Sequence, residues 1–107
     1  IATKYLNSIV NPKIVLPVAE NIDNHVFHLF VIRTENRNDL QQYLKENGIE
    51  TLIHYPIPPH KQEAMKAFQH LSFPITEKIH NEVLSLPISP VLTDSEVDEI
   101  INTMNKY

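Results

Sequence analysis

The residues best suited to chemistry are concentrated in one short segment, residues 54–60, which reads His-Tyr-Pro-Ile-Pro-Pro-His. Its two imidazoles and one phenol can donate and accept hydrogen bonds, and imidazole changes charge near neutral pH. The prolines forbid a helix or strand interior, so the segment is predicted to be a stiff loop. Such a loop at the end of a strand is a suitable place to hold a polar ligand. The alternative is a proline-rich turn whose Tyr55 packs on the core, and the residues alone leave both interpretations open.

The chain contains six histidines, which raises the hypothesis of a metal site. Their spacing does not support it. His25 and His28 lie three residues apart in a predicted strand and therefore point to opposite faces. There is no H-E-x-x-H pair and no cysteine to complete a structural zinc site, so we expect no metal. We predict that His28, between Val26 and Phe30, is a partly buried histidine rather than a catalytic one.

Several other kinds of site are excluded because Gly48 is the only glycine in the chain. One glycine cannot build a phosphate-cradling loop, a dinucleotide-binding fingerprint or a nucleophile elbow. We therefore assign no catalytic residue from motifs.

Composition describes an ordinary globular domain. The chain has 107 residues, of which 42% are hydrophobic and 21% charged, enough for one domain with a single core. The net charge of -4 and the scattered lysines and arginines argue against nucleic acid or an anionic membrane surface as a partner. The absence of cysteine fits a reducing cytoplasm, and no apolar stretch is long enough to span a bilayer.

The elements that must position the 54–60 segment follow from hydrophobic spacing and end signals. The predicted helices cover residues 1–10, 36–47, 61–71, 74–83 and 94–104, and the predicted strands cover residues 25–33, 49–55 and 84–89. Both faces of residues 25–33 are largely apolar, so that strand is predicted to be central. This order predicts an α+β domain in which a short sheet of about three strands packs against helices.

Four local signals set the expected helix ends. Asn36 is predicted to cap the second helix, and Gly48 to end it in a left-handed conformation. Pro74 is predicted to open a helix, and Thr93 with Glu96 to form a capping box at the start of the last one. Residues 1–10 read as the middle of a helix with no N-cap and the chain does not begin with Met, so we expect a piece of a longer protein.

Several strings occur in an order that resembles a known family. They are residues 26–33 (Val-Phe-His-Leu-Phe-Val-Ile-Arg) with Arg37 and Leu40, residues 48–51 (Gly-Ile-Glu-Thr) leading into 54–60, Phe73-Pro74 with Glu77, residues 84–90 (Leu-Ser-Leu-Pro-Ile-Ser-Pro), and the helix opened by Thr93. Together they resemble the C-terminal small domain of DegT/StrS-type pyridoxal-phosphate-dependent nucleotide-sugar aminotransferases. The resemblance covers nearly the whole chain.

The resemblance implies a parent enzyme of fold type I, a homodimer whose large domain carries pyridoxal phosphate on a lysine. That cofactor acts as an electron sink while an amino group moves from an amino acid, usually glutamate, to a keto sugar carried on a nucleotide. The large domain is missing here, and no lysine falls in a segment that resembles the family's cofactor lysine. We therefore expect the chain alone to bind no cofactor and to be inactive.

The resemblance also assigns a site. His54 and Tyr55 fall on the stretch that approaches the active-site cleft and His60 lies just beyond, so all three are predicted to bind substrate. The run from Tyr55 to Lys61 looks closest to family members acting on 3-keto deoxy sugars linked to dTDP. The alternatives are a free-standing α+β ligand-binding or regulatory module and a structural interaction domain.

Overall fold

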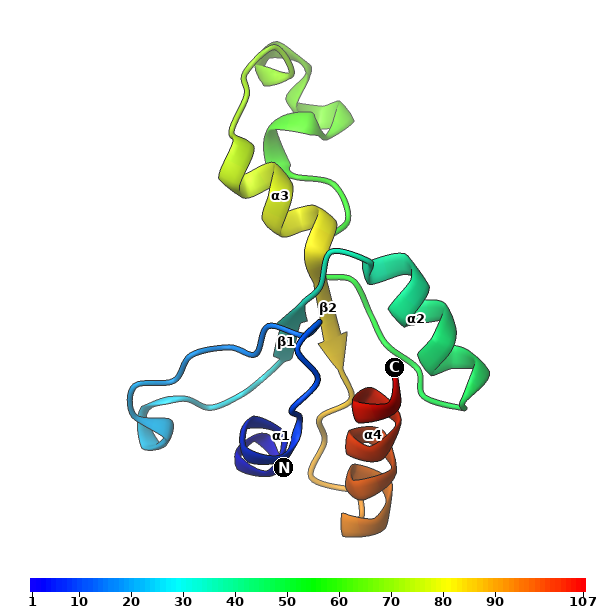
Figure 1. The fold of residues 1–107 in the computed structure, drawn as a ribbon. Coiled ribbons are helices and arrows are strands. Elements are labelled where there is room, and N and C mark those ends of the chain that lie inside the picture. The colour runs from blue at the N-terminus through cyan, green and yellow to red at the C-terminus, as the bar shows by residue number, and fades with distance from the viewer.

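The computed structural model describes all 107 residues and is organised around two antiparallel strands, β1 (Phe30–Arg33) and β2 (Val83–Leu86). Their register pairs Phe30 with Leu86 and Arg33 with Val83. Each strand has a single-residue bridge on its outer side. Val15 bridges to Arg33 of β1, and Leu52 bridges to Ser85 of β2. Short extended segments therefore flank a minimal sheet (Figure 1).

Four α-helices and three short 3₁₀ helices complete the chain. They are α1 (Ala2–Ser8), α2 (Arg37–Glu46), α3 (Pro74–Glu82), α4 (Asp94–Lys106), η1 (Ile22–Asn24), η2 (Pro59–Lys61) and η3 (Glu63–Phe68). In Figure 1, α1 and α4 lie below the sheet, α2 lies to its right, and α3 extends upward from the start of β2. None of these helices is long and apolar enough to cross a membrane.

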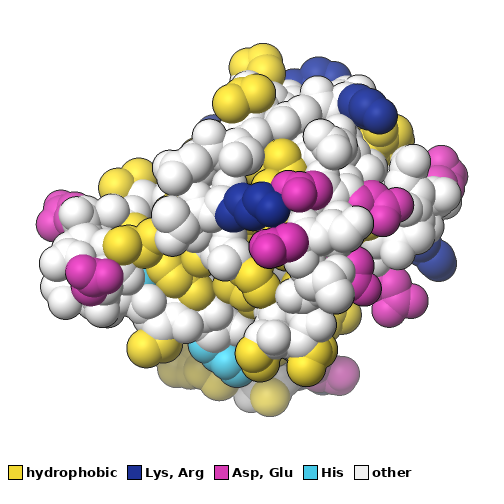
Figure 2. Space-filling view, turned by 90° about the horizontal axis from the view of Figure 1, so that it is seen from below, with side chains coloured by type: hydrophobic (Ala, Val, Ile, Leu, Met, Phe, Trp, Pro, Cys, Tyr) yellow, Lys and Arg dark blue, Asp and Glu magenta, His cyan; other side chains and the backbone are white.

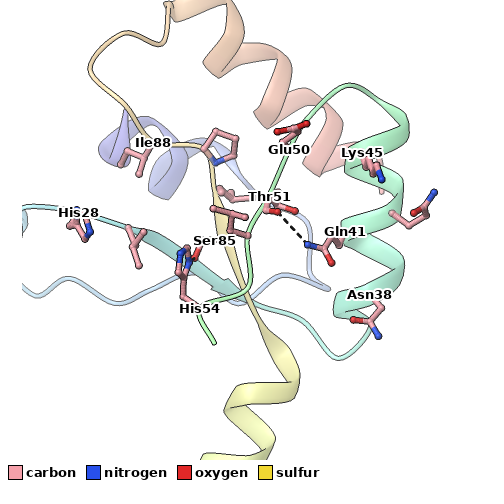
Figure 3. Close-up of a pocket in the computed structure, with 14 residues that line it drawn as sticks. His28, Asn38, Gln41, Lys45, Glu50, Thr51, His54, Ser85 and Ile88 are labelled. Carbon is pink, nitrogen blue, oxygen red and sulfur yellow. Dashed lines mark hydrogen bonds between the residues drawn. The ribbon is translucent and has the colours of Figure 1, made fainter. Parts of the chain in front are cut away.

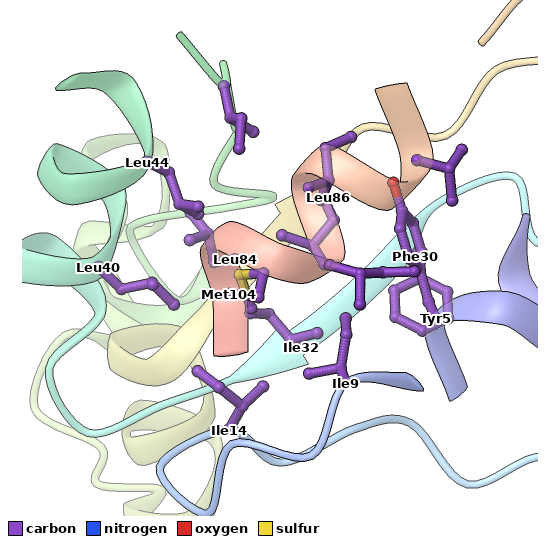
Figure 4. Close-up of a cluster of buried hydrophobic side chains, with 14 residues drawn as sticks. Tyr5, Ile9, Ile14, Phe30, Ile32, Leu40, Leu44, Leu84, Leu86 and Met104 are labelled. Atoms are coloured by element: carbon purple, nitrogen blue, oxygen red, sulfur yellow. The ribbon is translucent and has the colours of Figure 1, made fainter. Parts of the chain in front are cut away.

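The hydrophobic core lies between one face of the sheet and the helices α1, α2 and α4 (Figure 4). Phe30 and Ile32 of β1 are fully buried in it, while the residues between and after them are only partly buried, as the period of a strand requires. Tyr5 of α1 packs edge-on against Phe30, with ring centroids 5.0 Å apart. Its hydroxyl donates to the carbonyl oxygen of Pro87 at 2.8 Å, and burial raises the pKa of this phenol to about 12.

Residues 55–82, here called the arm, project away from this core (Figure 1). The arm supplies no member of the hydrophobic core. Its path is fixed by polar contacts instead. His60 Nε2 and Glu77 Oε1 are 2.9 Å apart, and Lys61 Nζ donates to the carbonyl oxygens of Gln69 and Leu71, each at 2.9 Å. The arm is thus an ordered extension that the small core does not cover.

The α+β class is supported, but the expected sheet of about three strands is wrong in detail. The segment predicted as strand 49–55 is not a strand of the sheet. Its single link to the sheet is the bridge between Leu52 and Ser85 of β2. The central strand begins at Phe30 rather than at residue 25. Phe27 has a φ of +44° and its ring stacks on His25 at 3.9 Å, so the chain turns before β1. The last strand starts at Val83 and ends before Pro87.

The helix predicted at 61–71 is also wrong. Two short 3₁₀ segments stand there, Met65 has non-helical φ and ψ, and the face expected to pack inward is largely exposed. Ile75 of α3, likewise expected inward, is 78% exposed. In both places the arm offers no core against which an apolar helix face could pack. The helical spacing of apolar residues in the sequence therefore did not produce a buried face.

The helix-end predictions are largely confirmed. Gly48 adopts a φ of +78°, and the N–H groups of Gly48 and Ile49 donate to the carbonyls of Lys45 and Leu44 in the two-bond pattern of a Schellman motif. The capping box of α4 is present, and α3 begins at Pro74. Asn36 occupies the N-cap position of α2, as predicted, but its side chain makes no capping hydrogen bond.

Candidate functional site

A cavity of about 660 Å³ opens between α2, the extended segment 49–54 and the end of β2 (Figure 3). Its walls are mainly polar at α2 and mainly apolar beyond β2. The lining residues are His28, Leu29, Asn38, Gln41, Gln42, Lys45, Glu50, Thr51, Leu52, His54, Ser85, Leu86, Pro87 and Ile88. The lining therefore comes from four stretches of the chain, residues 28–29, 38–45, 50–54 and 85–88, which the fold brings together at this one depression.

The polar wall is one face of α2. Asn38, Gln41, Gln42 and Lys45 are spaced at positions that share a side of a helix, while Leu44 on the other side is fully buried in the core. Gln41 Nε2 donates to the carbonyl oxygen of Thr51 at 3.3 Å. This hydrogen bond ties the helix to the extended segment and keeps the two walls at a fixed separation.

His54 is held on the opposite wall by Ser85. The ring atom Nδ1 lies 2.9 Å from Ser85 Oγ, and Figure 3 shows the two side chains side by side. Two backbone hydrogen bonds between Leu52 and Ser85, of 2.8 and 3.3 Å, set the position of the segment that carries His54. The imidazole is therefore placed by the pairing of this segment with β2.

Thr51 adds a feature of its own to the cavity. Its hydroxyl oxygen is buried and is the one buried side-chain polar atom in the chain without a hydrogen-bond partner. The polar side chains that line the cavity include the amides of α2, the imidazole of His54 and the charged groups of Lys45 and Glu50. Such a surface suits a ligand with many hydrogen-bonding groups better than a purely apolar molecule.

The three residues predicted to bind substrate are only partly brought together. His54 lines the cavity. Tyr55 follows it through a cis peptide bond, is 66% exposed, and its ring stands edge-on to the His54 ring with centroids 5.7 Å apart, but it does not line the cavity. His60 lies in the arm and is only 8% exposed.

The His60 ring interacts with neighbouring residues of the arm and does not face the cavity. Its Nε2 is 2.9 Å from Glu77 Oε1, and its ring packs edge-on against Phe73 at 4.9 Å. The hydrogen bond from His60, assisted by the N–H of Phe73, lowers the pKa of the Glu77 carboxyl. In this structure the pair ties η2 to α3 within the arm.

Two groups of cavity residues were missed from the sequence. His28 was expected to be partly buried between apolar neighbours, but Val26 is 93% exposed and His28 is exposed on the cavity rim. The error follows from the later start of β1. The polar face of α2 carried a usable signal, namely three amides and a lysine opposite the buried leucines of the same helix.

Charged groups elsewhere form local ion pairs, of which Arg33 with the buried Glu82, 2.6 Å apart, is the least exposed. Lys4 of α1 lies 2.7 Å from Asp98 and 3.8 Å from Asp94 of α4, and the Asp98 hydrogen bond raises the pKa of the lysine. The face in Figure 2 accordingly mixes acidic, basic and hydrophobic side chains. No group of three or more His, Cys, Asp or Glu side chains is placed to hold a metal ion.

Comparison with known protein families matches residues 2–105 to the DegT/DnrJ/EryC1/StrS aminotransferase family. The chain is 53% identical over 107 residues to a dTDP-3-amino-3,6-dideoxy-alpha-D-galactopyranose transaminase of Aneurinibacillus thermoaerophilus, covering all of this chain and 30% of that protein. It is 37% identical over 110 residues to a dTDP-3-amino-3,4,6-trideoxy-alpha-D-glucose transaminase of Streptomyces venezuelae, covering 29% of it. The chain thus spans about 30% of the length of these curated relatives.

Solved structures show the same likeness in three dimensions. The crystal structure of S. venezuelae DesV in complex with a ketimine intermediate superimposes with a TM-score of 0.91 at 37% identity, covering 98% of this chain and 29% of that one. The structure of NtdA from Bacillus subtilis with bound cofactor PMP gives a TM-score of 0.85 at 32% identity, covering 96% of this chain and 26% of that one.

Proposed function

The chain belongs to the DegT/DnrJ/EryC1/StrS aminotransferase family, and from this premise we propose that its parent protein is a pyridoxal-phosphate-dependent aminotransferase. The parent moves an amino group from an amino acid to a keto sugar linked to a nucleotide. Two relatives named as transaminases of dTDP-linked 3-amino sugars support this proposal. The observation that carries it within the chain is the cavity of amide, hydroxyl and imidazole groups around His54.

We propose that the chain is the C-terminal small domain of this parent. The comparisons support the family, and the C-terminal position is our proposal from the order of the motifs. The residues present do not fit a complete cofactor site. A Schiff-base lysine needs a shielded setting that keeps its amine reactive, and the buried residues of this chain include no lysine. Lys45, which lines the cavity, is exposed on the last turn of α2. The cofactor is therefore assigned to the rest of the parent, and the chain alone is inactive.

For the sugar we propose a dTDP-linked 3-keto deoxyhexose. The names of the two relatives support dTDP and the 3-amino position. We propose that His54 contacts the sugar from the cavity wall and that the exposed phenol of Tyr55 lies next to it at the cleft. His60 stays a prediction as a ligand contact, because its Nε2 is engaged with Glu77 in this structure.

We propose that the arm contacts the large domain of the same polypeptide. Six large hydrophobic side chains are 40–78% exposed along it, namely Tyr55, Ile57, Met65, Phe68, Phe73 and Ile75. Exposed apolar side chains in this number on an ordered extension are typical of a surface that another domain covers. A homodimeric parent and a cytoplasmic location stay predictions.

The test begins with the complete reading frame around this segment. We expect the full-length protein to carry pyridoxal phosphate on a lysine outside the segment. With glutamate as donor, we expect it to convert a dTDP-linked 3-keto-6-deoxyhexose to the amino sugar, detected by mass spectrometry. A reading frame without a lysine-bearing large domain would support the free-standing module instead. A segment at the N-terminus of that frame would contradict the C-terminal placement.

A further inference from the structure

The side chain of Ser85 occupies the point where the cavity wall is most firmly fixed. Its N–H donates to the carbonyl oxygen of Leu52 at 2.8 Å, its own carbonyl accepts from the Leu52 N–H at 3.3 Å, and on its other side it stands opposite Val31 of β1. Paired on both edges and only 5% exposed, Ser85 has little freedom. Its hydroxyl lies 2.9 Å from His54 Nδ1 (Figure 3).

The proton of that hydroxyl determines the state of the imidazole. A serine hydroxyl carries one donor, and His54 Nδ1 is the only hydrogen-bond partner of Ser85 Oγ within the chain. A buried donor that lacks an acceptor costs more free energy than an acceptor that leaves one lone pair unused. The hydroxyl therefore donates to Nδ1, and the proton of the neutral ring resides on Nε2.

The opposite ring nitrogen is free for a ligand. Nε2 of His54 has no hydrogen-bond partner within the chain, and the side chain lines the cavity. We infer that Ser85 is a positioning residue that presents His54 as an Nε2–H donor to a hydroxyl or carbonyl oxygen of the sugar. The identity of the ligand rests on the proposed function, whereas the tautomer rests on the geometry of the two side chains.

The tautomer can be measured without any assay of activity. The full-length parent is labelled with ¹⁵N-histidine, and the two ring-nitrogen shifts of His54 are recorded at a pH at which the imidazole is neutral. The signal is assigned by its loss in His54→Ala. We expect the proton on Nε2 in the wild type and a mixture of tautomers in Ser85→Ala. A wild-type ring protonated on Nδ1 would overturn the inference, whatever the enzyme's substrate.

Kinetics test the same claim through the ligand. Because one hydrogen bond is at stake, Ser85→Ala should raise the KM for the nucleotide sugar about two- to tenfold and leave the KM for the amino donor unchanged. Added to His54→Ala it should have no further effect, and Ser85→Thr, which keeps the hydroxyl, should restore the wild-type KM.

A matched control separates this role from a general effect of losing a serine. Ser89 lies in the segment that follows β2, and its Oγ accepts only from the N–H of Val91. Ser89→Ala should therefore leave the sugar KM unchanged. Additive losses in the double variant, or equal effects of Ser85→Ala and Ser89→Ala, would refute the positioning role. A parent with no amino transfer would refute the proposed function, and the tautomer would still decide this inference.

Discussion

Gly48 directs the chain from α2 into the segment that carries the cavity residues, so substitutions there test how the site is built. Its φ of +78° lies in the left-handed region, which costs an L-residue about 1–2 kcal/mol. A Cβ added at Gly48 would meet no atom within 4 Å, so no clash adds to this conformational term. The two Schellman hydrogen bonds fix the conformation, because both would be lost if the backbone relaxed.

The expected order of destabilisation is therefore set by the backbone alone. Gly48→Asn should be tolerated best, because asparagine enters the left-handed region more readily than other side chains. Gly48→Ala should cost somewhat less than the full conformational term, since alanine also restricts the unfolded chain. Gly48→Val should lower the free energy of unfolding by at least about 1 kcal/mol.

Urea denaturation followed by circular dichroism measures this series. With a slope of about 1 kcal/mol/M, at the lower end of the usual range for small domains, a loss of about 1–1.5 kcal/mol moves the midpoint down by about 1–1.5 M. An unchanged midpoint in Gly48→Val would refute the assigned end of α2 and the path of the segment after it. Equal losses for all three substitutions would show that the left-handed backbone is not the cause.

Three further predictions concern the cofactor, the arm and α4. The isolated chain mixed with pyridoxal phosphate should give no specific, saturable aldimine absorbance, and a tight adduct on a single lysine would contradict a cofactor site outside the chain. The His60 hydrogen bond holds the Glu77 pKa below its ordinary value of 4.5, so Glu77 stabilises the fold above that pH and loses this effect as pH falls through the lowered value. Glu77→Gln should therefore lower the melting temperature at neutral pH, and its difference from the wild type should vanish in acid; a constant difference would argue against a stabilising carboxylate at Glu77. Thr93→Ala, which removes the capping-box acceptor, should lower the free energy of unfolding by about 1 kcal/mol in urea titrations, and no change would show that α4 needs no cap.

The sequence predicted best what local chemistry decides. The left-handed Gly48, the proline that opens α3 and the Thr93 capping box each depend on residues within one or two turns, and all three appear in the structure. Likewise, the apolar face of α2 placed Leu40 and Leu44 in the core.

The errors arose where tertiary context decides. The segment 49–55 has strand-like alternation, yet it pairs with β2 at Leu52 alone, although that edge of β2 is not occupied by β1. The arm has helical spacing at 61–71, yet no core lies beneath it. His54 was identified through resemblance, but its partner Ser85 is 31 residues away and only the folded chain brings the two together.

The most direct test of the central claim separates the two half-reactions of the full-length parent. In His54→Ala, single-turnover rates are measured once with the amino acid and once with the nucleotide sugar. We predict a loss of about two- to tenfold in kcat/KM for the sugar half-reaction, with the amino-acid half-reaction and the cofactor spectrum unchanged. Tyr55→Phe should show the same selectivity. Equal losses in both half-reactions, or wild-type rates together with a lowered melting temperature, would contradict the assignment of this wall to the sugar.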